Sequence, residues 1–505
     1  MHKKSLIICF NLHQLEKALY LKSTINRSIQ ISCLYSIEKS FLSEGLPKII
    51  TFKSPTELCK FRNSFEQFIF FSMVATKELV ELLVTLKKAN RNVIAIQETH
   101  QLSTHNGEIN NLILPIDSIL AASDLEKEML VDNGPHAAKK ILSLGWLFQR
   151  SFLSFVKNLH SKNIRLQYKI NILLIFSAPN SITLGSQESY KKRIKIINFL
   201  QNRYPRQKIH LRLHPQENIT HFNNFLKNNK KENIEILQQN ESMYSLIKNA
   251  SMIVVSDKTQ AVLDLSFDNK SLLIYSLGKK NFISEYLDKV LDSEIENGIS
   301  FFFIEDPELI FLNFHQKFFK SAENTQKRIN QFFSSNSFQS FEYTREFILW
   351  KKVFGLKMTA LEIKALKKYL DFNSNSWLDE VKENTSLKNV IAIIGLQEIA
   401  RGNIIVEKNI VAIFDNLITP QVFATYTLEA LNAYFYSRCK NLNINLHPVS
   451  KEILEAYRQK SNEVIKLFYV IEDKIYITSH SIIRSFLYYC LIKIFRILQL
   501  IKIKF

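Results

Sequence analysis

The chain has 505 residues, of which 46% are hydrophobic, and its 66 Lys and Arg against 47 Asp and Glu give a net charge of +19. A chain of this length and apolarity buries enough surface for two or three domains, which excludes a mainly disordered protein. The charge favours an anionic partner, which leaves nucleic acid, a lipid surface and a phosphorylated substrate open.

Glycine and cysteine usage excludes further classes. The chain has only 10 glycines and contains neither G-x-G-x-x-G nor G-x-x-x-x-G-K-[ST], so the dinucleotide fingerprint and the P-loop are absent from the sequence. Its 5 cysteines form no C-x-x-C pair, which disfavours a disulfide framework and a structural zinc site. We therefore expect a cytoplasmic protein. The first apolar run is too short for a signal peptide, and no run is long enough to predict a membrane-spanning helix.

Short apolar runs alternate with helical patterns along the first part of the chain. Buried strands are predicted at Ser5–Phe10, Ile29–Tyr35, Phe68–Met73, Asn92–Ile96, Ser118–Ala122 and Lys140–Gly145. Helices are predicted from Leu12, over Lys77–Ala89 and over Asp124–Asp132. This alternation is typical of a parallel sheet covered on both faces.

The same alternation restarts after a polar, basic stretch. Strands are predicted at Ile170–Phe176, Lys208–Leu213, Ile234–Leu237, Met252–Val255 and Ser271–Tyr275, with helices over Glu188–Arg203, around Asn223, over Met243–Lys248 and over Thr259–Phe267. The segment 306–340 reads as mostly helical. We expect an α/β chain with two Rossmann-like domains, at 1–150 and 168–345, a mixed and mostly helical extension at 346–480, and a basic amphipathic tail at 481–505.

One predicted strand ends in a group of basic side chains. The two-residue period places His210, Arg212 and His214 on one face, and Pro215 stops the strand at its carboxyl end, where open α/β sheets bind ligands. An Arg fork and an imidazole suit a phosphate or pyrophosphate. An edge strand with one solvated basic face is the alternative.

A second strand ends in Ser256 and Asp257, which are both common helix N-cap residues, before a helix predicted from Thr259. Hydroxyls and free amides at such a junction can bind an anion. An ordinary capped junction is the alternative. Two strand ends of this kind in one half of the chain indicate a nucleotide pocket.

These segments carry a resemblance. The runs Ile172–Asn180, Arg212–Glu217 and Asn249–Thr259, followed by Leu272–Tyr275, resemble the second domain of bacterial GT-B glycosyltransferases of capsule and lipopolysaccharide synthesis. The similar groups are the sialyltransferase-like, Kdo-transferase-like and CDP-glycerol phosphotransferase-like families. About 110 residues are covered well, and the first half is similar only in architecture.

The resemblance implies that a His-Pro pair and a Ser/Thr pair hold the phosphate and ribose of a cytidine or uridine nucleotide. The predicted donor-binding residues are Arg212, His214, Pro215, Ser256, Lys258, Thr259 and Ser177. For the general base that takes a proton from the acceptor hydroxyl, the candidates are Glu98 and His100, which follow a predicted strand in the first half. His105, Asn106 and Glu108 lie near them, and solvated loop residues are the alternative interpretation.

No D-x-D occurs, so no metal ion is expected, and no cofactor is predicted besides the donor substrate. The tail 482–505 carries Arg484, Lys493, Arg496, Lys502 and Lys504 among large apolar side chains and has no acidic residue. It is predicted to lie on an anionic membrane surface, with a packed core helix or a partner-binding segment as alternatives.

The leading hypothesis is a metal-independent, inverting glycosyltransferase at the cytoplasmic face of a bacterial inner membrane. It would move a sugar from a nucleotide-sugar donor, with a CMP-sugar favoured, to a glycan or lipid-linked glycan acceptor of the cell surface. A CDP-polyol phosphotransferase of the same fold, a non-catalytic scaffold and a nucleic-acid-binding protein are the alternatives. No signature of a nucleic-acid-binding motif is found, so no nucleic-acid partner is expected.

Overall fold

Two seven-stranded sheets organise the chain in the computed structural model. The model describes residues 4–24, 29–35, 49–71, 77–97, 116–133, 140–161, 169–176, 187–213, 219–229, 231, 233–237, 242–259, 261–277, 281–335, 348–349, 351–352, 356–369 and 394. The predicted α/β class with two Rossmann-like units is confirmed by the order and direction of the strands. The extension predicted for 346–480 and the tail 481–505 lie almost entirely outside the described residues.

The first sheet is parallel throughout. Its strands run in the order β3 (Ile49–Phe52), β2 (Ile29–Leu34), β1 (Ser5–Cys9), β4 (Gln67–Phe70), β5 (Asn92–Ile96), β6 (Ser118–Ala121) and β7 (Ile141–Ser143). Its helices are α1 (Leu12–Thr24), the 3-10 helix η1 (Pro55–Phe61), α3 (Lys77–Lys88) and α5 (Asp124–Asn133). Every residue of β1, β4 and β5 is buried, as expected for strands covered on both faces.

The second sheet repeats this strand order over its first five strands. It runs β10 (Ile234–Ile236), β9 (Ile209–Arg212), β8 (Ile170–Ile175), β11 (Ala250–Ser256), β12 (Ser271–Leu277), β14 (Ile299–Ile304) and β13 (Glu294–Glu296). The five strands from β10 to β12 are parallel, and β14 and β13 add an antiparallel hairpin at the edge. Its helices are α7 (Gln187–Arg203), α8 (Ile219–Asn228), α9 (Met243–Asn249), α10 (Ala261–Leu265) and α11 (Phe282–Val290).

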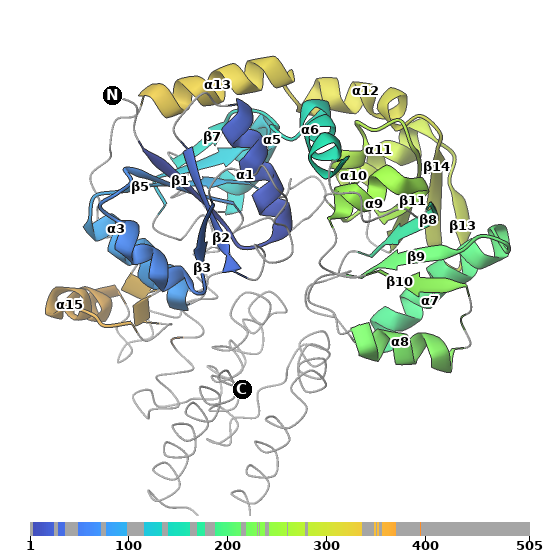
Figure 1. Cartoon of the computed structure of the whole chain (residues 1–505), viewed down its shortest axis with the longest axis horizontal. Helices are drawn as coiled ribbons and strands as arrows, with labels where there is room; N and C mark the ends of the chain where they lie inside the picture. The colour runs from blue at the N-terminus through green and yellow to red at the C-terminus, as the bar shows by residue number, and fades with distance from the viewer. Residues whose placement is uncertain are drawn as a thin grey trace, which may run out of the picture.

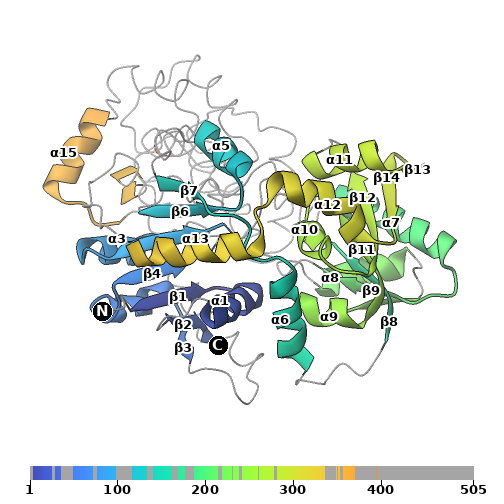
Figure 2. The same cartoon turned by 90° about the horizontal axis from the view of Figure 1, so that it is seen from above.

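Helix α6 (Arg150–Ser161) lies between the two units, where it contacts both α1 and α9 (Figure 2). Its amphipathic sequence explains this position, because Phe152 packs on Tyr20 of α1 and on Tyr244 of α9, with ring centroids 5.4 and 5.3 Å apart. One buried hydrophobic cluster therefore continues from the first sheet to the second. A separate cluster fills the other face of the second sheet.

Two further helices, α12 (Pro307–Phe318) and α13 (Ala322–Ser335), follow the second sheet, and α13 returns to lie along the first unit (Figures 1 and 2). Gln326 donates to the carbonyl of Thr24 at 2.7 Å. Gly145 has a φ of +109°, and a Cβ there would lie 2.2 Å from Oγ1 of Thr325, so the close approach of α13 requires glycine. The domain limits given above stay predictions, although α13, within the range 168–345, contacts the first unit.

Helix α15 (Ala360–Tyr369) is the last described helix. Among the helices that the structure describes, none is long and apolar enough to cross a membrane.

Candidate functional site

The carboxyl ends of β8, β9 and β11 form one edge of the second sheet, and the predicted donor-binding residues that the structure describes lie at the ends of β9 and β11. Ile175 of β8 is level with Arg212 of β9 on one side and with Val255 of β11 on the other. Arg212 and Ser256 therefore reach the same edge, two strand spacings or about 10 Å apart. Between β8 and β11 the direction of strand addition reverses, and open α/β sheets bind ligands outside such a switch point.

Strand β9 is an interior strand, because β10 and β8 pair with it on its two sides. The alternative of an edge strand with a solvated face is therefore wrong. His210 is buried, and its Nε2 lies 3.4 Å from the Glu235 carboxylate. Burial lowers the pKa of His210, with the charge of Glu235 opposing this shift. Arg212 is the described basic residue at the carboxyl end of this strand, and it is half-buried.

The junction after β11 is a tight turn whose polar groups bond mainly to one another. The Lys258 amide donates to Oγ of Ser256 at 3.2 Å, and the Thr259 amide donates to the carbonyl of Ser256 at 3.2 Å. Oγ1 of Thr259 accepts from the Ala261 amide at 3.4 Å. The following helix, α10, covers Ala261–Leu265 rather than the expected Thr259–Phe267, because the turn uses these groups. Side chains rather than these amides are left to contact a ligand.

The carboxyl group of Asp257 lies fully buried beneath this turn. The hydroxyl of Ser276 donates to it at 2.7 Å and that of Ser256 at 3.3 Å, while Nδ2 of Asn281 donates to the Asp257 carbonyl at 2.9 Å. Burial raises the pKa of Asp257, and the hydrogen bond from Ser276 is the largest opposing effect. Asp257 thus ties the end of β11 to β12 and to the start of α11.

Lys258 leaves the turn in another direction. Its Nζ donates to the carbonyl of Leu277 at the end of β12, at 3.2 Å. The cation is thereby held between the ends of β11 and β12, and its side chain stays half-buried rather than fully covered. The predicted contact of Lys258 with a donor phosphate stays a prediction.

Four of the predicted donor-binding residues are described: Ser256, Lys258 and Thr259 share this turn, and Arg212 lies across β8 from it. Ser256 is buried and its hydroxyl is occupied by Asp257 and by the Lys258 amide, so its observed contacts stabilise the turn. The other predicted residues, Ser177, His214 and Pro215 for the donor and Glu98 and His100 for the base, lie outside the described residues.

The first unit meets this region through the start of α1. Asn11 follows β1, and its Oδ1 accepts from the Gln14 amide at 2.8 Å, which caps the helix. One turn in, the buried Glu16 carboxylate accepts a hydrogen bond from the hydroxyl of Ser242 at the start of α9. Ser242 occupies the N-cap position of α9 without making a side-chain cap, because its hydroxyl is turned to Glu16. Since α1 and α9 each follow a parallel strand, the carboxyl edges of the two sheets face each other here (Figure 1).

An imidazole lies at the same contact. The ring of His13 stacks on Tyr244 of α9, with centroids 5.4 Å apart, and its Nδ1 lies 3.9 Å from Glu16. The side chain of His13 is 27% exposed, whereas that of Glu16 is 1% exposed. The hydroxyl of Tyr244 donates to Asp264 of α10 at 2.8 Å, which connects the contact to the helix after the turn of Ser256.

The sequence interpretation did not single out His13 or Glu16. A histidine two residues after an N-cap, directly behind a buried strand, was the available signal, because it places the imidazole at the carboxyl edge of the first sheet. Only the fold shows that α9 covers that edge.

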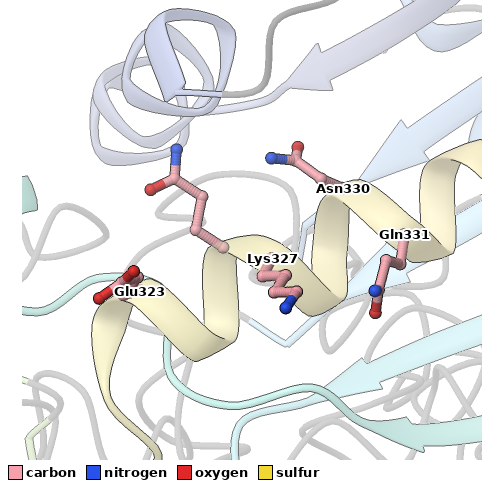
Figure 3. Close-up of a pocket in the computed structure, with 5 residues that line it drawn as sticks. Glu323, Lys327, Asn330 and Gln331 are labelled. Carbon is pink, nitrogen blue, oxygen red and sulfur yellow. The ribbon is translucent and has the colours of Figure 1, made fainter.

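A hollow on the surface of α13 lies apart from these sheet ends. It is lined by Glu323, Gln326, Lys327, Asn330 and Gln331 (Figure 3). None of the predicted site residues that the structure describes lines it. Within the described ranges, no group of three or more His, Cys, Asp and Glu side chains is arranged to hold a metal ion, and metal independence stays a prediction.

Comparison with known proteins gives similarity in structure only. No protein-family model matches the chain, and no curated protein matches its sequence. Similar solved structures include a UDP-GlcNAc 2-epimerase from Methanocaldococcus jannaschii in complex with UDP-GlcNAc and UDP, at 14% identity and a TM-score of 0.44, covering 66% of this chain and 100% of that one. The wall teichoic acid polymerase TagF is similar at 12% identity and a TM-score of 0.37, covering 72% of this chain and 90% of that one. MurG from Acinetobacter baumannii matches at 9% identity and a TM-score of 0.29, covering 65% of this chain and 95% of that one. At these low scores and identities, the similarities assign neither a family nor an activity.

Proposed function

We propose that this chain is a glycosyltransferase of the GT-B type, which moves a sugar from a nucleotide-activated donor to a glycan or lipid-linked glycan acceptor. The proposal is supported by two Rossmann-like units that are joined at the starts of α1 and α9 by the hydrogen bond from Ser242 to Glu16, with Arg212 and the turn 256–259 on either side of β8 at the switch point of the second sheet. A CMP-sugar is the favoured donor, on the resemblance of the second unit to cytidine-nucleotide enzymes.

In this proposal the second unit binds the donor. The Arg212 guanidinium and the Lys258 ammonium contact the phosphate of the nucleotide, together with His214 from the segment after β9. As the bond between the anomeric carbon and the phosphate oxygen breaks, the nucleotide leaves with the electron pair, and these cations stabilise the charge that develops. No step of this reaction uses a metal ion.

The first unit supplies the base. The acceptor hydroxyl loses its proton to a side chain as its oxygen bonds to the anomeric carbon on the face opposite the nucleotide, which inverts that centre. Glu98 and His100 are the candidates from the sequence, and His13 is the candidate from the geometry. The stacking of His13 on Tyr244 fixes the plane of the imidazole, and the Glu16 carboxylate, 3.9 Å from Nδ1 and beyond hydrogen-bonding distance, favours the charged form that His13 takes when it accepts the proton.

Donor binding is the first test. We expect one cytidine- or uridine-activated sugar to raise the melting temperature of the wild type in a panel of CMP, CDP, UDP and GDP donors. Arg212→Ala and His214→Ala should each reduce that shift. Lys208→Ala is the matched control, since Lys208 is a cation near the amino end of the same strand, paired with Glu235 at 2.7 Å.

Three results would contradict the proposal. The first is a panel in which no nucleotide changes the melting temperature. The second is an equal loss in the Lys208 control, which would show that charge in general rather than the carboxyl edge matters. The third is a phosphodiester rather than a glycosidic product from the stabilising donor, which would indicate the CDP-polyol phosphotransferase instead.

A further inference from the structure

Helix α15 is held to the protein by one buried ion pair. Nζ of Lys351 donates to both carboxylate oxygens of Glu362 at 2.7 Å, and both side chains are buried. The same carboxylate accepts from the Thr359 amide at 2.6 Å. Hydrogen bonds and the charge of Lys351 lower the pKa of Glu362 in spite of its burial. The pair therefore neutralises itself inside the protein and fixes which face of α15 points outward.

The outward face carries positive charge and large apolar side chains. We call it the α15 surface, and it consists of Lys357, Leu361, Ile363, Lys364, Lys367 and Lys368, all of which are exposed. Glu362 is the one acidic residue of the segment 356–369, and it is paired with Lys351. None of the four lysines forms an ion pair within the described part of the chain. Leu361 is 80% exposed and Ile363 is 44% exposed.

The spacing groups these side chains. Lys364, Lys367 and Lys368 stand three and four residues apart, so they share one stripe of the helix. At 100° per residue, Leu361 and Ile363 fall on the two margins of that stripe. The face thus presents a row of ammonium groups with an apolar side chain at each border.

The α15 surface is separate from the site described above. Both views show α15 at the outer margin of the first unit, on the side away from the second sheet (Figures 1 and 2). An anionic ligand of the switch point between β8 and β11 therefore does not account for its charge.

We propose that the α15 surface docks on an anionic lipid bilayer. Its lysines contact the headgroup phosphates, and Leu361 and Ile363 enter the boundary between headgroups and acyl chains. Lysines with large exposed apolar side chains on a short helix fit the layered chemistry of that boundary, which pairs anionic charge with hydrocarbon. A nucleic acid would complement the lysines but offers the two aliphatic side chains no comparable layer, so the apolar pair favours the bilayer. This inference does not depend on the proposed transfer reaction.

The test is sedimentation of the full chain with vesicles. Vesicles of phosphatidylcholine and phosphatidylglycerol in equal parts should bind the protein, and vesicles of phosphatidylcholine alone should bind it weakly. Each lysine near an anionic membrane contributes about fivefold in affinity, so Lys364→Gln, Lys367→Gln and Lys368→Gln combined should weaken binding about 100-fold. Leu361→Ser should weaken it about tenfold at high salt, where the apolar contribution remains.

A matched control removes the same charge elsewhere. Lys191, Lys192 and Lys195 are exposed on α7, at the second unit, and their combined change to Gln should leave binding within about twofold, because charges far from the membrane are screened. Circular dichroism would show that all variants fold.

Four outcomes would overturn the proposal. The first is vesicle binding by the α15 triple variant at the wild-type level, and the second is an equal loss of vesicle binding in the α7 control. The third is vesicle binding that Leu361→Ser leaves unchanged. The fourth is an α15 triple variant that loses binding to random duplex DNA while its vesicle binding is unchanged. Wild-type binding by the triple variant would point to another segment, such as 482–505, as the anchor.

Discussion

Removing the carboxyl group of Asp257 tests whether the turn after β11 is held from below. Asp257→Ala leaves the hydroxyls of Ser276 and Ser256 without their acceptor, and both serines are almost fully buried. An unpaired buried polar group costs about 1–3 kcal/mol. The hydroxyl of Ser256 still accepts a hydrogen bond from the Lys258 amide, which reduces the cost at that residue. We therefore expect the free energy of unfolding to fall by about 2–5 kcal/mol.

Asp257→Asn separates the hydrogen bonds from the charge. The amide oxygen can still accept from Ser276, so this variant should lie within about 1 kcal/mol of the wild type. The pKa of Asp257 is raised by burial in the folded state, so the native protein binds this proton more tightly than the unfolded chain does. Because of Asp257, the free energy of unfolding should fall as the pH rises from the ordinary aspartate pKa through the raised pKa of this carboxyl group. The Asn variant should lack that fall.

Urea unfolding followed by circular dichroism, over pH values from the ordinary aspartate range to neutrality, measures both effects. An Asp257→Ala variant as stable as the wild type would refute the role of this carboxyl group. So would an Asp257→Asn variant that loses as much free energy of unfolding as Asp257→Ala. That role is also refuted if the difference between the wild type and the Asn variant is the same at every pH.

Three further predictions concern two buried polar contacts and the candidate base His13. Glu362→Gln removes one partner of a buried ion pair, so it should lower the free energy of unfolding by about 3–5 kcal/mol and expose α15 to limited proteolysis. As a control, the double change Lys351→Met and Glu362→Met should regain the lost stability. Tyr244→Phe deprives the buried carboxylate of Asp264 of its hydroxyl donor and should cost about 1.5–3 kcal/mol in urea unfolding, whereas an unchanged midpoint would show that this hydrogen bond is not needed. His13→Ala should lower the rate of sugar transfer about 10²–10⁴-fold with donor-induced melting shifts retained, and an unchanged rate would remove His13 as the base.

The sequence predicted most strands of the two sheets because each is a short apolar run, and most of these runs are buried. It did not predict β3, whose four residues are mostly half-buried, or the hairpin of β13 and β14. Asn297 and Gly298 join those two strands with φ of 52° and 76°. An Asn-Gly pair between strands is a strong hairpin signal, so this element was open to prediction from the sequence.

The return of α13 to the first unit was not open to prediction in the same way. Its pattern predicts a helix with one apolar face, but neither the pattern nor the chain order says which sheet that face covers. The small residue at Gly145, next to the buried Trp146, became informative only when Thr325 was seen to lie against it.

The candidate site shows the same division. The alternation Ile209, Leu211 and Leu213 predicts correctly which side chains of this segment join the hydrophobic cluster of the second sheet, and the end of β11 was expected at Ser256, where it lies. Those signals are local, because a strand and the polar residues after it are neighbours in the chain. The structure shows the hydroxyl of Ser256 bonded within the turn, and its predicted contact with the nucleotide-sugar donor stays a prediction.

The contacts that bring the two units together join residues that are far apart in the chain. The hydrogen bond between Ser242 and Glu16 joins residues 226 positions apart, and neither residue can be predicted from the other in the sequence. The buried Glu16 carboxylate lies one turn into α1, and the N-cap residue Ser242 makes no side-chain cap on α9, so each of these features is explained only by the hydrogen bond between them. The orientation of the two sheets therefore rests on contacts between residues far apart in the chain, which a strand-by-strand interpretation cannot supply. Phe152 of α6 adds to these contacts, because it packs against both α1 and α9.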